Sequence, residues 1–282
     1  MKILILGYKG MLGHELVEAF TEGNELILWD REQIDITKRD DVIRKIGELK
    51  PDVVINSAAY TAVDKAESEK DLVYKVNGCA VGFLATICKE IDALLIHFST
   101  DYVFDGENQH GYKEDYPVTK PINLYGRSKF LGEKMIADID PRHYLIRTSW
   151  LFGKSGKNFV ETMIHLAEEK REIKVVNDQF GSPTYAKDLA FKVRELVDEK
   201  KPSGIYHITN SNHCSWYEFA VKIFELMGLK PNVKPVKSEE FIMVAKRPVY
   251  SMLINTKLSP TRSWEEALKA YLEETGRIGI NC

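Results

Sequence analysis

The sequence predicts an α/β fold, a doubly wound parallel sheet with a smaller C-terminal region. Short apolar runs alternate with segments of helical periodicity, a pattern typical of buried parallel strands joined by crossover helices. These runs lie at residues 3–6, 25–29, 53–55 and 93–98. The first run leads directly into the glycine triplet Gly7-x-x-Gly10-x-x-Gly13. The last run ends in Ser99, Thr100 and Asp101, as expected where strand ends meet at one edge of a sheet.

Each predicted strand is followed by a predicted helix. Apolar positions at Leu16, Val17 and Phe20 indicate a helix after the first strand, and Leu72, Val76 and Leu84 indicate one after the third. Residues 123–134 form the next expected helix. We therefore expect a dinucleotide-binding domain of the Rossmann type over residues 1–150. Residues 151–282 form a discontinuous, mainly substrate-binding region, with some segments returning to the sheet. In that region, residues 158–169 and 216–226 have helical patterns, the second preceded by Ser215 as N-cap.

Composition excludes several classes of partner. The 282 residues are 44% hydrophobic and 29% charged, with a net charge of −3, which indicates a globular protein without an electrostatic footprint for nucleic acid or membrane. No window approaches the roughly 20 apolar residues of a membrane span. The four cysteines are widely scattered and predict free thiols rather than disulfides or zinc; they are Cys79, Cys88, Cys214 and Cys282. We expect a cytoplasmic location.

The glycine triplet predicts a dinucleotide cofactor. One glycine turns the chain, one lets a diphosphate approach the backbone, and one lets the helix pack close to the strand. Free N–H groups at the helix start then face the anion. The triplet at residues 7–13 lies between a strand and a helix, which is the context that the motif requires. The alternative is a tight strand–helix turn without a ligand.

Asp30 follows the second predicted strand, where an acidic side chain accepts hydrogen bonds from the adenosine ribose. It disfavours a 2′-phosphate, whereas the adjacent Arg31 can pair with one. NAD and NADP therefore both remain open. A capped turn is the alternative role for Asp30.

Tyr125 and Lys129 are four residues apart, so they share one face of the predicted helix. A positive charge about 4 Å from the phenol is worth roughly 4 kcal/mol at an effective dielectric near 20. This corresponds to a lowering of the tyrosine pKa by about three units, which favours a proton-transfer role. The same spacing also occurs by chance in many helices. Similarly, Thr100 could hydrogen-bond the substrate oxygen or only cap a turn.

Taken together, these motifs resemble the extended short-chain dehydrogenases/reductases. Within them, the sequences Ser-Thr-Asp-Tyr-Val-Phe at 99–104, Ala-Val-Asp-Lys-Ala-Glu at 62–67 and Asn-Asp-Gln-Phe-Gly-Ser-Pro-Thr at 177–184 are similar to the dTDP-4-dehydrorhamnose reductase family. The resemblance implies reduction of a dTDP-4-keto-6-deoxy-sugar, with NADPH or NADH as cofactor and a dTDP-sugar as the bound partner. It extends over nearly the whole chain and is least diagnostic after about residue 260.

The resemblance also implies roles for individual residues. The catalytic group is Thr100, Tyr125 and Lys129. The cofactor-binding residues are Gly7, Gly10, Met11, Leu12, Gly13, Asp30, Asp35, Ile36, Ala59, Tyr60, Thr61, Tyr125 and Lys129. The substrate-binding residues are Thr100, Asp101 and Trp150. Arg247 is a further candidate, because a guanidinium group can pair with the substrate diphosphate. The alternative for Trp150 is a role in the core, and the alternative for Arg247 is an ordinary surface position.

This chain departs from the family pattern at one of the metal-binding positions. Some relatives hold magnesium between subunits through glutamates, and Glu15 matches one such position. Another of these positions carries Lys187 here, which cannot ligate a cation while charged. We therefore expect no metal site; a homodimer remains compatible with the sequence, but metal bridging is disfavoured.

Two rival functions share these motifs. A nucleotide-sugar epimerase or 4,6-dehydratase would keep the fold and the Tyr125/Lys129 pair, but dehydratases usually carry an Asp-Glu pair where this chain has Asp101-Tyr102. A noncatalytic regulatory subunit of the methionine adenosyltransferase type would also keep the fold. Intact Thr100, Tyr125 and Lys129 argue against it, and oxidation of NADPH by the ketosugar would separate the two.

Overall fold

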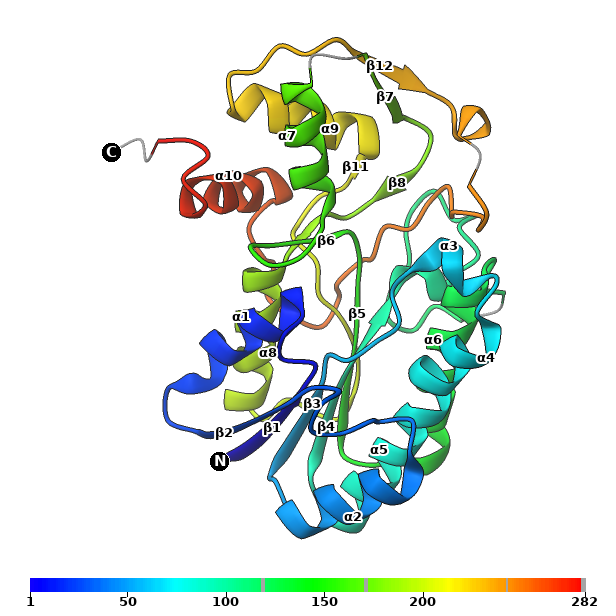
Figure 1. The fold of residues 1–282 in the computed structure, drawn as a ribbon, viewed down its shortest axis with the longest axis vertical. Helices are drawn as coiled ribbons and strands as arrows, with labels where there is room; N and C mark the ends of the chain where they lie inside the picture. Colours follow the sequence, from blue (N-terminus) through cyan, green and yellow to red (C-terminus); the bar gives the residue numbers. More distant parts are fainter. Residues whose placement is uncertain (118–119, 170–171, 242, 280–282) are drawn as a thin grey trace.

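A six-stranded parallel sheet forms the lower part of the molecule (Figure 1). The computed structural model describes residues 1–117, 120–169, 172–241 and 243–279. In spatial order the strands are β10 (Gly204–His207), β5 (His143–Thr148), β4 (Leu94–Thr100), β3 (Val53–Asn56), β1 (Lys2–Leu6) and β2 (Glu25–Trp29). The strand order reverses between β1 and β3, so a crevice opens at the carboxyl ends of these two strands.

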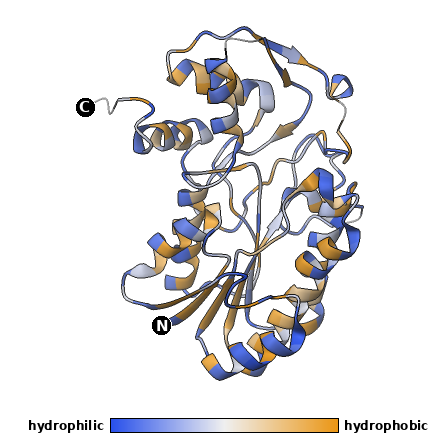
Figure 2. Ribbon diagram, viewed as in Figure 1, coloured by the Kyte–Doolittle hydropathy of each residue, from blue (hydrophilic) through white to orange (hydrophobic). Residues whose placement is uncertain are grey.

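Helices cover both faces of the sheet, as predicted. Ile3 and Ile5 pack on one face and Leu4 and Leu6 on the other, because successive side chains of a strand point to opposite sides. The first face is covered by α1 (Met11–Thr21) and α8 (Ala186–Asp198). The second is covered by α2 (Arg39–Leu49), α5 (Ala80–Glu90) and α6 (Leu124–Ile139). Figure 2 shows the strands as continuously hydrophobic, as expected for a sheet buried on both faces.

A second, smaller layer lies above the sheet in Figure 1 and has its own core. Its helices are α7 (Phe159–Glu168), α9 (Trp216–Leu226) and α10 (Trp264–Glu274). The short strands pair as β6 (Leu151–Phe152) with β9 (Thr184–Tyr185), β7 (Ile173–Val176) with β12 (Val233–Val236), and β8 (Phe180–Gly181) with β11 (Cys214–Ser215). Ser215 caps α9 in a capping box with Glu218. Between these elements the chain returns to the sheet through α8 and β10, whereas the division at residue 150 stays a prediction.

The segment between β3 and β4 corrects one expectation from the sequence. It forms α4 (Lys70–Tyr74), the π-helical turn η1 (Lys75–Cys79) and α5 without a break. By length and composition alone, Lys70–Glu90 could cross a membrane, contrary to our reading of the sequence. However, 56% of its most apolar window is buried inside the structure, as in the core helix of a globular fold.

Helix α6 lies unusually close to the end of β4. A Cβ added at Gly126 would lie 2.1 Å from the carbonyl oxygen of Tyr102 in η2 (Asp101–Val103). No side chain fits at that distance, so only glycine lets the helix approach. This contact brings Tyr125 and Lys129 to the crevice. The side chain of Asn123 caps the helix by accepting a hydrogen bond from the Gly126 N–H at 2.7 Å.

Replacing Gly126 tests this contact. We expect Gly126→Ala to lower the free energy of unfolding by about 1–3 kcal/mol, because α6 must move away from η2. The matched control is Gly47→Ala in α2, where the added methyl would meet only Ile87 Cδ1, at 3.4 Å. That change should stabilise the protein by roughly 0.5–1 kcal/mol through helix propensity. Thermal unfolding of both variants checks the prediction; equal melting temperatures would contradict it.

Candidate functional site

Two adjoining cavities occupy the crevice at the carboxyl ends of the strands. Their volumes are about 380 and 570 Å³. Both are lined by Gly10, Ser57 and Ala59, so they form one continuous cleft. Cavities of this size at the switch point of a parallel sheet are where such folds bind ligands.

The smaller cavity collects the residues expected to hold the adenosine half of a dinucleotide. They are Gly7, Gly10, Asp30, Asp35, Ile36, Ala59 and Tyr60. Asp30 Oδ1 accepts a hydrogen bond from the Arg31 N–H at 2.7 Å, and Arg31 also lines the cavity. Asp35 already accepts two hydrogen bonds from Thr37, which lower the pKa of its carboxyl and fix the turn.

The start of α1 fits a diphosphate. Its N-cap is Gly10, which has no side chain to occupy the first-turn N–H groups of Met11, Leu12 and Gly13. A Cβ at Gly13 would lie 2.3 Å from the Gly7 carbonyl oxygen, so the tight turn requires glycine there. The open N–H groups and the helix dipole form an anion site.

The larger cavity brings together residues from five separate parts of the chain. Its lining includes Gly10, Met11, Leu12, Gly13, Ala59, Thr61, Thr100, Asp101, Tyr125, Lys129 and Trp150. All of these were predicted from the sequence. Thr100 ends β4, and Tyr125 and Lys129 lie on successive turns of α6. The structure therefore places the three predicted catalytic side chains on the wall of one cavity.

The hydroxyl of Thr100 donates to Asp101 Oδ1 at 2.8 Å. Burial raises the pKa of Asp101 to about 6, although hydrogen bonds from Ser251 and Thr100 oppose the rise. Burial also raises the pKa of Tyr125 to about 12; the charge of Asp101 adds to this, and a hydrogen bond from Thr100 opposes it. The sequence predicted the opposite direction for Tyr125, so that expectation is wrong for this structure.

Lys129 is buried, and its ammonium contacts two acceptors on β4. Its Nζ donates to the carbonyl oxygen of Phe98 at 2.5 Å and lies 3.4 Å from His97 Nε2. Burial lowers the lysine pKa to about 8, and Glu133 opposes this effect. His97 was not identified from the sequence as part of the site. Its position three residues before Thr100 in the same strand is the signal that could have indicated its involvement.

Asn77, at the π-helical turn, joins the two sides of the cleft. Its side-chain oxygen accepts from the Tyr60 N–H at 2.9 Å, and its amide nitrogen donates to the Tyr60 carbonyl and to Ser128 Oγ, both at 3.0 Å. Single π-helical turns often occur at functional sites. Asn77 thus holds the loop after β3 at a fixed distance from α6.

The two remaining predicted substrate residues, Trp150 and Arg247, have different surroundings. Trp150 lines the larger cavity, and its ring stacks on Trp216 at 3.5 Å between ring centroids. Gly181 packs so closely against the same indole that an added Cβ would lie 2.3 Å from Cε2. The Trp150 backbone has a φ of 46°. Arg247 does not line either cavity; its guanidinium forms two hydrogen bonds with Asp64, at 3.1 and 2.8 Å. The structure therefore gives Arg247 a partner within the chain, and its contact with substrate phosphate stays a prediction.

Lys187 forms ion pairs close to Glu15. Its Nζ lies 2.6 Å from Glu274 and 3.2 Å from Glu18. Burial raises the pKa of Glu274, but hydrogen bonds from Lys187, Tyr185 and Lys154 outweigh it and lower the pKa to about 2. Burial raises the pKa of Glu15. Among the residues that the structure describes, no group of three or more His, Cys, Asp or Glu could hold a metal ion.

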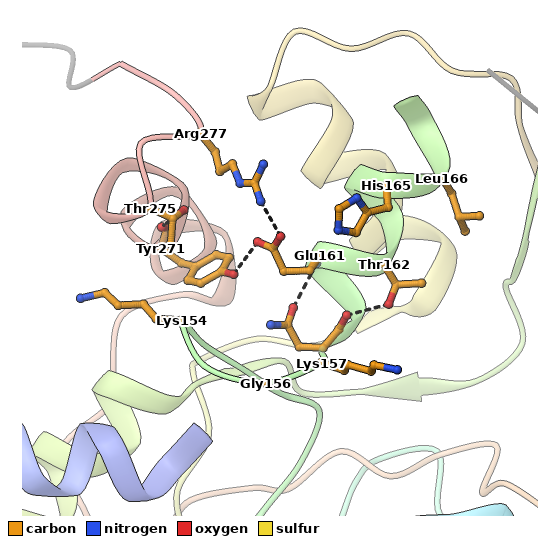
Figure 3. Close-up of a pocket in the computed structure, with 11 residues that line it drawn as sticks. Lys154, Gly156, Lys157, Glu161, Thr162, His165, Leu166, Tyr271, Thr275 and Arg277 are labelled. Carbon is orange, nitrogen blue, oxygen red and sulfur yellow. Dashed lines mark hydrogen bonds and ion pairs between the residues drawn. The ribbon is translucent and has the colours of Figure 1, made fainter. Parts of the chain in front are cut away.

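A third hollow of about 670 Å³ lies between α7 and α10 (Figure 3). Glu161, near its centre, accepts hydrogen bonds from Tyr271 at 2.7 Å and Arg277 at 2.6 Å. Its lining contains none of the three predicted catalytic residues. It meets the larger cavity only at Gly156 and Lys157. The predicted catalytic residues therefore line the crevice and not this hollow.

Comparisons with known proteins agree with this geometry. The family model described as RmlD substrate binding domain matches residues 1–277. The spore coat polysaccharide biosynthesis protein SpsK of Bacillus subtilis is 44% identical over 278 residues, 97% of each chain. The dTDP-4-dehydrorhamnose reductase of Burkholderia thailandensis is 39% identical over 92% of each chain. The crystal structure of dTDP-4-dehydrorhamnose reductase from Bacillus anthracis in complex with NADP has a TM-score of 0.93, at 40% identity, and covers 97% of this chain and 99% of that one.

Proposed function

Because this chain belongs to the RmlD substrate binding domain family, we propose that it reduces the C4 ketone of dTDP-6-deoxy-L-lyxo-4-hexulose to dTDP-L-rhamnose. The cofactor is NADPH or NADH, and the reaction takes place in the cytoplasm. The observation that supports this most is the convergence of Thr100, Tyr125 and Lys129 on a cavity continuous with the glycine-lined diphosphate site. The relatives named dTDP-4-dehydrorhamnose reductase support the choice of substrate.

One part of the cleft binds the cofactor, and the other part binds the sugar. Gly10, Met11 and Leu12 bind the diphosphate through backbone N–H groups, and Asp30 binds the adenosine ribose. Lys129 lines the cavity where the second ribose would lie. When bound, the reduced nicotinamide supplies hydride to the ketone carbon. Trp150, just beyond β5, lines the same cavity as Thr100, and we infer that its indole contacts the deoxysugar ring.

Tyr125 is the proton donor. With a pKa of about 12 the phenol is fully protonated near neutral pH, so it is ready to give its proton to the oxygen that gains negative charge. Thr100 hydrogen-bonds the same oxygen and fixes its position. The ammonium of Lys129 stabilises the phenolate that remains and helps it to regain a proton. Tyr102 packs edge-on against Tyr125 at 5.9 Å between centroids, in the position where a dehydratase would carry its second acid.

The direct test is an assay of the purified protein with the ketosugar nucleotide and each reduced cofactor. We expect oxidation of the cofactor in proportion to substrate, with the L-rhamno product identified by NMR. The corresponding D-gluco ketosugar is the matched control and should react more slowly. Cofactor that binds without being oxidised would instead indicate a regulatory subunit, and a product of other stereochemistry would overturn the assigned substrate.

Replacing Tyr125 tests the proton donor. We expect Tyr125→Phe to lower kcat by about 10²–10⁴-fold, the usual contribution of a positioned acid. Binding of the cofactor, measured by fluorescence titration, should stay nearly unchanged because the ring still fills its place. The matched control is Tyr217→Phe, which lies on α9 away from the cleft. Near-normal turnover in Tyr125→Phe would remove Tyr125 from this role.

Arg31 should set the preference for NADPH. Its side chain lines the adenosine cavity beside Asp30 and can pair with a 2′-phosphate. We expect Arg31→Ala to raise the KM for NADPH about tenfold, the loss of one charge-assisted contact, and to leave the KM for NADH nearly unchanged. The control is Arg39→Ala, because Arg39 pairs with the exposed Asp40. An equal rise for both cofactors would show that Arg31 does not read the phosphate.

A further inference from the structure

Three buried polar side chains form a line behind the catalytic cavity. Asn56 ends β3, His97 lies opposite it in β4, and Lys129 comes from α6. Each is no more than 2% exposed. Asn56 Nδ2 lies 3.1 Å from His97 Nδ1, and His97 Nε2 lies 3.4 Å from Lys129 Nζ. The imidazole thus bridges a strand end to the lysine.

The chemistry of the three groups fixes the direction of the hydrogen bonds. Burial, together with the charge of Lys129, lowers the pKa of His97 well below its usual range, so the ring is neutral and has one donor and one acceptor. An ammonium has only protons to offer, so Nε2 must be the acceptor and Nδ1 must carry the hydrogen.

Nδ1–H then needs an acceptor on Asn56. Within the part of the chain that the structure describes, Asn56 Oδ1 is buried without a hydrogen-bond partner while its amide nitrogen faces the ring. The two ends of an amide are nearly isosteric. Exchanging them gives the ring N–H its acceptor and leaves a single consistent arrangement, from Lys129 through His97 to Asn56.

We propose that His97 is a positioning residue for Lys129 and that Asn56 holds it in the required tautomer. This inference rests on the proposed reductase function. Phe98 and His97 accept two of the three ammonium protons, which leaves the third directed to the cavity that Lys129 lines. A flexible side chain with three equivalent donors thereby acquires one orientation. Both acceptors belong to β4, whose last residue is Thr100, so a single strand aligns the lysine and the threonine.

Two substitutions separate positioning from packing. The side-chain amide of His97→Gln can reach the place of Nε2 and accept from Lys129, whereas that of His97→Asn can replace only Nδ1. We expect His97→Gln to retain kcat and cofactor affinity to a large extent. His97→Asn should lower kcat and weaken binding of NADPH by about tenfold each, the loss of one hydrogen bond to a charged group. His143→Asn, at the start of β5, is the matched control.

The pH dependence provides a readout that packing alone would not change. The titratable groups that interact with the ammonium are His97 on β4 and Glu133 on α6, and Tyr125 and Asp101 line the same cavity. Losing an acceptor disfavours the charged lysine, so the Lys129 pKa, followed by NMR of its labelled Cε without substrate, should be lower in His97→Asn than in His97→Gln. This measurement, like cofactor binding, remains informative if the ketosugar is not the substrate.

Equal effects of Gln and Asn on the lysine pKa and on cofactor affinity would overturn the proposal. If His97→Asn does not fold, as judged by circular dichroism, Asn56→Leu gives the same test because it removes the acceptor that fixes the tautomer. We then expect a lowered Lys129 pKa and weaker NADPH binding. An unchanged pKa in Asn56→Leu would contradict the proposal.

Discussion

The hydrogen bond from Lys129 to the carbonyl oxygen of Phe98 is the contact on which the geometry of the site depends. A buried ammonium is costly unless it has acceptors, so α6 is held where Nζ can reach β4. Tyr125 lies one turn earlier on the same face. Fixing the lysine against the strand therefore also fixes the phenol near Thr100, at the end of that strand. The close approach at Gly126 makes this distance sterically accessible.

A second buried contact lies one turn further along α6. Glu133 forms two hydrogen bonds with Arg147 on β5, at 2.7 and 3.0 Å, and accepts a third from Ser99 on β4 at 2.5 Å. Arg147 also lies 5.0 Å above the ring of Phe104. The desolvation of such a pair can offset its Coulomb energy. Its main effect is then to specify register, because any sliding of α6 along the two strands would leave a charge buried and unpaired.

Much of the fold follows from local pattern. The apolar runs predicted the four strands β1 to β4 but not β5, and the glycine spacing at 7–13 predicted the tight turn before α1, because period and turn geometry are set by nearby residues. The meeting of Thr100 with Tyr125 and Lys129 was implied by the family resemblance, and the structure brings all three to one cavity. The partners of individual buried groups were not predictable. His97 meets Asn56 and Lys129 across 41 and 32 residues, and Arg247 meets Asp64 across 183. The pKa of Tyr125 moved against expectation because burial is a tertiary property that spacing does not reveal.

The opposite pKa shifts of Tyr125 and Lys129 on α6 set the charges that the two side chains carry before any reaction. Burial penalises charge, so it raises the pKa of Tyr125 to about 12 and lowers that of Lys129 to about 8. Near neutral pH the phenol is therefore protonated and the lysine is still mainly charged. In the proposed reaction, transfer of the proton to the substrate oxygen would leave a phenolate one helical turn from the Lys129 ammonium, and the attraction between these opposite charges is stronger in a medium of low dielectric. The burial that makes the resting phenol a weak acid thus strengthens the attraction that stabilises its conjugate base at the moment of reaction.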